Sequence, residues 1–363
     1  MSWDQSVRGI VLAGSYPAGQ GRAGASLIGP LSPVAQKPLI SYVLRWLYEG
    51  GVRQAAVCLN EATRHVRGLL GDNTSFALDL EYCHDDTPRG PAGCVRDAGL
   101  ALGGRTFVVA EGALIPTGSV VELLNSHKRS GAILTIALDQ DRRQLMGGDR
   151  PASPAGLYVF DRRAFEFIPA QGFQDIKEAL IPRLYEAGEV VQMHVVPGVS
   201  VRIRDEESYL LANEWLVQRA AAWHPGSAGL DPGVHTRPSR CGADVRIIGP
   251  VVFGPGVKVM ARATIVGPTS IGAGTTIGSG ALVSRSVLWA RCNVGAEAVV
   301  DRGLLAEGAV VEPGARIFNA VRVSPPQGRT RPGWLRRFVR QPAAVPRRVS
   351  GGLPAAIAAR RDI

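Results

Sequence analysis

The sequence predicts two folds in series, an α/β domain with a mostly parallel sheet and, after it, a parallel β-helix. The first fold is indicated by strand-like and helix-like runs that alternate between residues 8 and 222. The second is indicated by apolar residues that recur every six positions from Ile247 to Ile317. A length of 363 residues is enough for two domains, each with its own core.

The alternation in the first domain consists of short apolar runs separated by amphipathic ones. Because such an order builds a parallel sheet covered on both faces, ligands are expected at the carboxyl ends of the strands. The strand candidates are residues 8–13, 54–59, 78–82, 106–110, 133–138 and 156–160. The helix candidates are residues 40–49, 62–70, 95–102, 120–127, 175–187 and 206–221.

The period of six excludes a single helix, whose period is about 3.6, and a lone strand, whose period is about 2, as the structure of the second domain. Six residues make a short strand and a turn, and three such sides make one turn of a triangular solenoid, so the repeat is long enough for about four turns. The positions in step are Ile247, Phe253, Val259, Ile265, Ile271, Ile277, Val283, Leu288, Val294, Val300, Leu305, Val311 and Ile317.

The remaining stretches divide the chain. Residues 223–242 are rich in Gly, Pro and Ser and are predicted to be a linker. We therefore predict an α/β domain over residues 1–222, the linker, a β-helix over residues 243–320 and a basic tail over residues 321–363. Helical spacing in the tail places Trp334, Leu335 and Phe338 on one face. Two interpretations stay open: contact with a membrane surface or an acidic partner, and a disordered Arg-rich segment.

The net charge of +10 belongs mostly to the tail. Residues 325–363 contain nine Arg and one acid, which leaves about +2 for the preceding 324 residues and argues against a nucleic-acid-binding groove. Five scattered cysteines, no apolar run of about 20 residues and an N-terminus unlike a signal peptide predict a cytoplasmic protein. His84, beside Cys83 and Asp85, has no second cluster to complete a metal site.

Residues 10–40 have the layout of a phosphate-binding loop. An apolar strand ends at Ala13, Gly14 opens a loop of small residues, and a helix follows Lys37 and Pro38. Backbone N–H groups at such a junction can bind phosphate oxygens. The stretch resembles the start of the sugar-phosphate nucleotidyltransferases, or NDP-sugar pyrophosphorylases. Their signature, Leu-Ala-Gly-Gly-x-Gly-Thr-Arg-Leu-x-Pro-Leu-Thr-x-x-x-Pro-Lys-Pro, lies on residues 12–30 without a gap.

This resemblance covers residues 8 to about 320. The domain order is similar to that of guanylyl- and adenylyl-transferring members, such as mannose-1-phosphate guanylyltransferases. It implies a Rossmann-like nucleotidyltransferase domain followed by the left-handed parallel β-helix of hexapeptide-repeat proteins, which builds oligomers. In the family reaction a sugar 1-phosphate attacks a nucleoside triphosphate and pyrophosphate leaves, so the protein supplies cations and magnesium ligands. An acyltransferase role would lack its usual base, because no His follows His235.

Four positions that this chemistry uses carry other residue types. In the register of the resemblance the family's Arg and Lys fall on Gly19 and Gly29, and its two magnesium Asp residues fall on Ala113 and Arg202. We therefore predict no catalytic residue, no metal site and no cofactor. Whether the protein is an enzyme stays open at this point.

Substitutes for these residues lie two or three positions away, at Arg22, Glu111 and Asp205. If they act, magnesium remains the cofactor. A two-residue offset along a strand, however, moves a side chain by about 6.6 Å, whereas magnesium ligands lie at about 2.1 Å from the ion.

The family's ligand-binding segments are matched more closely in this sequence than its catalytic positions. The sequence DTPRGPAG (86–93) resembles a Glu-x-Pro-Leu-Gly-Thr-Ala-Gly loop that approaches the nucleotide base, and AGLYVF (155–160) resembles an Ala-Gly-Ile-Tyr-Val-Phe strand near the sugar phosphate. The simpler alternative is that these glycines and prolines only form turns and helix starts. The predicted nucleotide-binding residues are Leu12, Ala13, Gly14, Arg89, Gly90, Pro91 and Gly93, and the predicted substrate-binding residue is Gly156.

The sequence thus predicts a catalytically degenerate sugar nucleotidyltransferase homologue. It would bind a nucleotide or nucleotide sugar weakly, form homo- or hetero-oligomers through its β-helix, and act as a regulatory or scaffold subunit. The alternative is an active NDP-sugar pyrophosphorylase with displaced catalytic ligands. A third hypothesis is a structural partner that binds no nucleotide. The sequence names neither a base nor a sugar.

Overall fold

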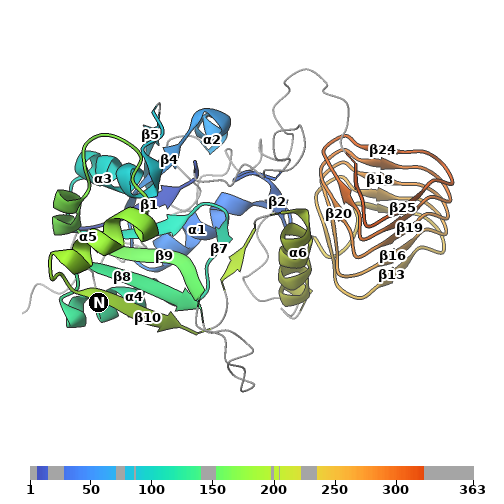
Figure 1. The fold of residues 1–363 in the computed structure, drawn as a ribbon. Helices are drawn as coiled ribbons and strands as arrows, with labels where there is room; N and C mark the ends of the chain where they lie inside the picture. Colours follow the sequence, from blue (N-terminus) through green and yellow to red (C-terminus); the bar gives the residue numbers. More distant parts are fainter. Residues whose placement is uncertain are drawn as a thin grey trace, which may run out of the picture.

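The computed structural model describes residues 6–14, 28–70, 78–85, 87–139, 153–197, 200–203, 205–221 and 235–322. Over these residues the chain forms an α/β domain and a parallel β-helix, with helix α6 (Glu206–Ala221) standing between them (Figure 1). Both predicted folds are confirmed. The predictions for Gly19, Arg22, Asp86, most of the linker and the tail fall outside the described residues.

The sheet of the first domain has seven strands in the order β10-β8-β9-β6-β1-β4-β5. Only the pairs that involve β9 are antiparallel, so the sheet is mostly parallel, as predicted. The strands are β1 (Val7–Leu12), β4 (Gln54–Leu59), β5 (Asp79–His84), β6 (Thr106–Glu111), β8 (Leu134–Asp139), β9 (Ser153–Asp161) and β10 (Val191–Val196). Two small antiparallel pairs are β2 (Pro33–Val34) with β3 (Lys37–Pro38), and β7 (Leu114–Ile115) with β11 (Val201–Arg202).

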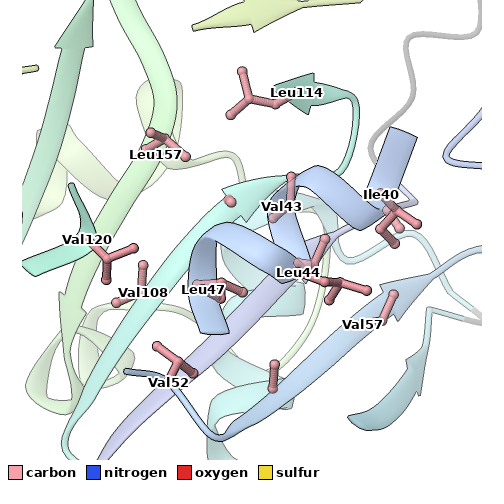
Figure 2. Close-up of a cluster of buried hydrophobic side chains, with 14 of the residues drawn as sticks. Ile40, Val43, Leu44, Leu47, Val52, Val57, Val108, Leu114, Val120 and Leu157 are labelled. Carbon is pink, nitrogen blue, oxygen red and sulfur yellow. The ribbon is translucent and has the colours of Figure 1, made fainter. Parts of the chain in front are cut away.

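Helices cover both faces of this sheet and form two separate cores. On one face α1 (Leu39–Glu49) packs with α4 (Val120–Ser130), and Figure 2 shows Val43, Leu44 and Leu47 of α1 directed at the strands that carry Val57 and Val108. The other face carries α3 (Gly90–Leu102) and α5 (Ile181–Glu186). Shorter elements are η1 (Glu61–Thr63), α2 (His65–Leu70), η3 (Arg162–Phe167) and the π-helical turn η4 (Ile176–Leu180).

The β-helix has three parallel sheets of five strands each, one sheet for each side of the coil. The first contains β12 (Arg240–Cys241), β15 (Lys258–Val259), β18 (Thr276–Ile277), β21 (Asn293–Val294) and β24 (Val310–Val311). The second contains β13 (Arg246–Ile248), β16 (Thr264–Val266), β19 (Leu282–Ser284), β22 (Val299–Asp301) and β25 (Arg316–Phe318). The third contains β14 (Val251–Phe253), β17 (Thr269–Ile271), β20 (Val287–Leu288), β23 (Leu304–Leu305) and β26 (Val321–Arg322).

The positions predicted from the period of six line the interior of these coils. Those from Phe253 to Ile317 are all buried, whereas Ile247 is 37% exposed. Ile247 lies in β13, the end strand of its sheet, so its side chain has a neighbouring coil on one side only. Close stacking also explains a glycine after an inward position, because a Cβ on Gly254 would lie 2.5 Å from the backbone nitrogen of Ala273.

The two domains meet at helix α6. The hydroxyl of Tyr209 donates a hydrogen bond to the carbonyl of Pro33 and accepts one of 2.8 Å from Nε1 of Trp289 in the β-helix. The rings of Tyr209 and Trp289 pack edge to face at 6.4 Å. One fully buried side chain of α6 therefore connects the β2–β3 hairpin with the coils.

The β2–β3 hairpin is held on both sides of its turn. Oδ1 of Asn213 on α6 accepts a hydrogen bond of 2.9 Å from the N–H of Ala35, and Nε2 of Gln36 donates one of 2.7 Å to Oγ of Ser270 in β17. Ala35 and Gln36 have φ values of 45° and 70°. The turn thus places two residues other than glycine in the left-handed region, where the polar contacts from both domains hold them.

Candidate functional site

The end of β1 meets the ends of β4 and β6, at the sheet edge where a ligand is expected. The N–H groups of Ala13 and Gly14 donate to the carbonyl of Cys58 at 3.0 and 2.9 Å, and the N–H of Gly112 donates to Leu12 at 3.0 Å. Leu12 and Ala13 are buried. The three predicted residues therefore form the junction, but the N–H groups of Ala13 and Gly14 are already bonded. The rest of this loop, residues 15–27, lies outside the described part.

Arg89, a predicted nucleotide-binding residue, is engaged in contacts within the protein. Its Nε lies 2.9 Å from Oδ2 of Asp97, and its Nη1 and Nη2 donate to the carbonyls of Gly172 and Pro169 at 2.9 and 3.0 Å. Its backbone N–H donates to the carboxylate of Asp85. The guanidinium thus ties the start of α3 to the 169–172 segment, and nucleotide contact by this side chain stays a prediction.

The small residues of the same loop also have a packing explanation. Gly90 has a φ of 73°, and a Cβ there would lie 2.6 Å from the carbonyl oxygen of Gln174. Pro91 occupies the first turn of α3, where a missing N–H costs nothing. A Cβ on Gly93 would lie 2.8 Å from Cβ of Arg89. The geometry therefore favours glycine at positions 90 and 93 and accommodates proline at position 91, whether or not a base binds.

Ala113 and Arg202, the two positions on which the resemblance places magnesium aspartates, lie close together. Arg202 pairs with Leu114 across the β7–β11 ladder, and the N–H of Ile203 donates to the carbonyl of Ala113 at 3.0 Å. Residues about 90 positions apart are thus brought together beside the end of β6. What they present is a methyl group and a guanidinium.

Arg202 forms an ion pair with Glu111, one of the candidate substitutes named from the sequence. Nη2 of Arg202 lies 2.6 Å from Oε1 of Glu111, and the two side chains are 17% and 32% exposed. A charge-assisted contact of this length is a strong one for a partly buried pair. Nε of Arg202 is buried and has no hydrogen-bond partner among the described residues.

Gly156 and Tyr158 of β9 lie against this pair. A Cβ on Gly156, which has a φ of 79°, would lie 2.6 Å from Nη2 of Arg202 and 3.0 Å from Cδ of Glu111. Burial raises the pKa of Tyr158 to about 12; the charge of Glu111 adds to this rise and Arg202 opposes it. The predicted substrate-binding glycine therefore faces an internal ion pair.

A buried carboxylate nearby was missed by the sequence analysis. Asp139 ends β8, and its Oδ1 accepts a hydrogen bond of 2.9 Å from the N–H of Ser200. Burial raises its pKa, while the Ser200 hydrogen bonds and the charge of Arg202 act in the opposite direction. The available signal was an acid directly after a predicted strand, at the edge where ligands are expected.

Three other residues named in the sequence analysis have local contacts of their own. Asp205 caps α6, because its Oδ1 accepts from the N–H of Ser208 at 2.8 Å while its own N–H donates to Ser208 Oγ at 3.0 Å. Lys37 lies over the ring of Tyr42, 5.9 Å from its centroid. At Gly29, the position of the family's Lys, a Cβ would meet nothing within 4 Å.

The donor set beside β6 does not fit magnesium, which prefers carboxylate and water oxygens in an octahedral arrangement. A methyl group and a guanidinium occupy the two aligned positions, and the nearest carboxylate, Glu111, is paired with Arg202. Among the described residues no group of three or more His, Cys, Asp or Glu side chains is arranged to hold a metal ion.

None of the helices that the structure describes is long and apolar enough to cross a membrane.

Comparison with known proteins matches both parts of the chain. Residues 25–146 match a family model described as nucleotidyl transferase, and residues 250–285 match one described as bacterial transferase hexapeptide (six repeats). The chain therefore has a nucleotidyltransferase domain followed by hexapeptide repeats, and its homologues are sugar-phosphate nucleotidyltransferases.

These homologues have low sequence identity to this chain, but the matches cover most of both sequences. A low-salt glycan biosynthesis nucleotidyltransferase of Haloferax volcanii is 28% identical over 64% of this chain and 72% of its own length. A UTP–glucose-1-phosphate uridylyltransferase of Synechocystis is 24% identical over 79% of this chain and 84% of its own. A mannose-1-phosphate guanylyltransferase of Mycobacterium tuberculosis is 22% identical over 75% and 77%.

Proposed function

We propose that this chain is a catalytically degenerate sugar nucleotidyltransferase homologue that binds a nucleotide or a nucleotide sugar and acts as a regulatory or scaffold subunit. The observation that carries the proposal is the Arg202–Glu111 ion pair, 2.6 Å long, beside Ala113. It lies where the resemblance places two magnesium carboxylates. The homologues supply the ligand class, because two of them are named for sugar 1-phosphates.

The charges around the Arg202–Glu111 pair support the loss of a magnesium site. Replacing two carboxylates by a methyl group and a guanidinium changes the local formal charge from −2 to +1, and Glu111 brings it to zero. At an effective dielectric constant of about 20, each unit charge about 4 Å from the ion is worth roughly 4 kcal/mol per unit of ion charge. A neutral ion pair therefore provides little attraction for a divalent cation, and phosphoryl transfer that depends on one loses its largest electrostatic contribution.

Turnover is the first test. Wild-type protein with magnesium, a nucleoside triphosphate and a panel of hexose 1-phosphates should release pyrophosphate no faster than buffer. Robust release that is abolished by Glu111→Ala, and retained in Glu178→Ala on an exposed turn, would overturn the proposal in favour of an active NDP-sugar pyrophosphorylase with displaced ligands.

A charge-restoring variant tests the role of the ion pair. Ala113→Asp/Arg202→Asp places three carboxylates together, so the metal-free variant should melt below wild type and magnesium should raise its Tm, by roughly 2–4 °C for each kcal/mol of binding free energy. Wild type should show no such rise. If magnesium raised the Tm of wild type and variant equally, residues 111, 113 and 202 would not mark the position of a lost metal site.

Ligand binding is tested separately by calorimetry with nucleotides and nucleotide sugars, in magnesium and in EDTA. Weak binding that is nearly independent of magnesium is expected. Absence of any binding at millimolar concentration would remove the ligand from the proposal and favour a purely structural partner. The homo- or hetero-oligomer that the hexapeptide repeats predict is checked by light scattering.

A further inference from the structure

A cavity of about 450 Å³ lies between α6 and the β-helix, away from the ion pair described above. Its α6 wall carries three carboxylates, Glu206, Glu207 and Glu214, together with Leu210 and Leu211. Leu211 is 57% exposed. The volume is within the range of about 300–1,000 Å³ that ligand pockets have. The wall combines acidic groups with an apolar surface, which suits a segment that carries cations and large apolar side chains.

The opposite wall offsets these charges only in part. Arg285 lines the cavity, but its Nη2 lies 2.8 Å from both carboxylate oxygens of Asp301 and its Nε lies 3.1 Å from Oδ1. That pair is formally neutral. Arg302 adds one cation against the three carboxylates of α6, so the lining retains an excess of negative charge.

The chain itself leads into this cavity. Val321, the first residue of β26, belongs to the lining, and β26 is the last described strand, ending at Arg322. The sequence continues for 41 residues, and the stretch RTRPGWLRRFVR (329–340) contains five Arg with Trp334 and Phe338. Seven residues separate Val321 from Arg329, and an extended segment reaches about 3.3–3.6 Å per residue, so the stretch can contact every part of the lining.

We propose that residues 329–340 of the same chain dock in this cavity, with arginines on the α6 carboxylates and Trp334 and Phe338 against Leu210 and Leu211. The arginine charges match the acidic wall, and the two aromatic side chains match its apolar strip. A covalent connection gives the segment an effective concentration of the order of millimolar. At that effective concentration, an intrinsic dissociation constant at or below about 100 μM is enough to keep the cavity mostly filled.

Docking there bears on the joint between the two domains. Asn213 and Ser270 line the cavity, and the same two side chains hold Ala35 and Gln36 of the β2–β3 hairpin. A segment in the cavity therefore covers the polar contacts that join the α/β domain to the coils.

Trypsin cleavage of the full chain tests the proposal. In wild type, cleavage after Arg336 and Arg337, followed by mass spectrometry, should be at least about five-fold slower than in Glu206→Gln/Glu207→Gln, since those arginines lose their partners. Raising the salt concentration should accelerate wild-type cleavage, because screening weakens exposed ion pairs. The control Glu178→Gln/Glu186→Gln changes two exposed carboxylates on η4 and α5 and should behave as wild type. Equal rates in all three proteins overturn the proposal.

A reciprocal measurement leaves α6 unchanged and so excludes a direct effect on that helix. Arg336→Gln/Arg337→Gln/Trp334→Ser in the full chain should speed hydrogen exchange in peptides covering residues 206–217 by at least about three-fold. Unchanged exchange overturns the proposal. Protection that grows with protein concentration instead assigns the cavity to the tail of a second copy. Vesicle binding through anionic lipid that the tail variant loses, with unchanged exchange in α6, assigns the tail to a membrane surface.

Discussion

Two regions at the same edge of the sheet differ in how they relate to the family pattern. The loop that starts α3 keeps the small residues, Gly90 and Gly93. At the β7–β11 ladder, Arg202 and Ala113, the residue before β7, stand where the resemblance places carboxylates. In the first region packing against Gln174 and Arg89 already requires glycine. In the second, the changed residue has acquired a specific partner, Glu111. Retained residues therefore do not by themselves indicate a ligand, and changed residues need not leave a defect.

The largest expected effect comes from a substitution in the loop that starts α3. Gly90→Ala should lower the free energy of unfolding by about 3 kcal/mol, because a Cβ in the left-handed region would also strike the carbonyl of Gln174. Urea unfolding measures this, with Gly188→Ala as a control that shares the positive φ but meets nothing within 4 Å. If both variants lose the same stability, close approach does not determine the residue at position 90.

This result also limits how the loop can be used in binding experiments. A large side chain at Gly90, introduced to block a base, would first disturb the packing of α3 on the 169–174 segment. Loss of nucleotide binding in such a variant would report on folding as much as on contact.

A substitution with a smaller expected effect tests whether the Arg202–Glu111 ion pair stabilises the fold. Arg202→Ala should cost about 1–2 kcal/mol, because it leaves Glu111 partly buried without its partner, and the coupling with Glu111→Ala should be about 1 kcal/mol. Partial exposure of both side chains keeps these values below those of a fully buried pair. Chemical denaturation of the wild type, both single variants and the double variant gives the cycle. Additive effects would mean that the pair contributes nothing specific.

The pH dependence of Tyr158 sharpens the same point. Its pKa of about 12 lies above the ordinary value of 10, so its contribution to stability is complete below pH 10 and is lost as the pH rises toward 12. Arg202→Ala should raise the pKa further and Glu111→Gln should lower it, because the two charges act in opposite directions. Ultraviolet titration with Tyr158→Phe as the blank measures the shifts. Shifts in the reverse directions would contradict the described contacts.

The smallest effect concerns Gly29. Gly29→Ala should change stability by less than about 0.5 kcal/mol, since a Cβ there meets nothing within 4 Å. Thermal unfolding checks this directly. A large loss would reveal a steric reason for glycine at a position where, in the described structure, a longer side chain has room.

The sequence predicted the fold better than the contacts of the site. Period and alternation are local signals, so β1, β4, β6 and the interior of the coils were predicted. Strand β10 was not predicted. The start of α3 was predicted at residue 95 but lies at Gly90, because Gly90 and Pro91 are typical of a loop although both also fit a first helical turn. The approach of Arg202 to Glu111 joins residues 91 positions apart. Pairing at that separation depends on the β7–β11 ladder, which propensity alone does not indicate.

The hairpin that carries Ala35 and Gln36 has a consequence for thermodynamic linkage. Its turn is bonded to α6 through Asn213 and to the coils through Ser270, at 2.9 and 2.7 Å. A ligand that displaces this turn must weaken the contacts of the coils, and a protein that grips the coils must resist the displacement. Binding at the two places then obeys one coupling free energy, equal in both directions. A ligand whose binding displaces this turn would therefore respond to an assembly built on the β-helix without contacting it.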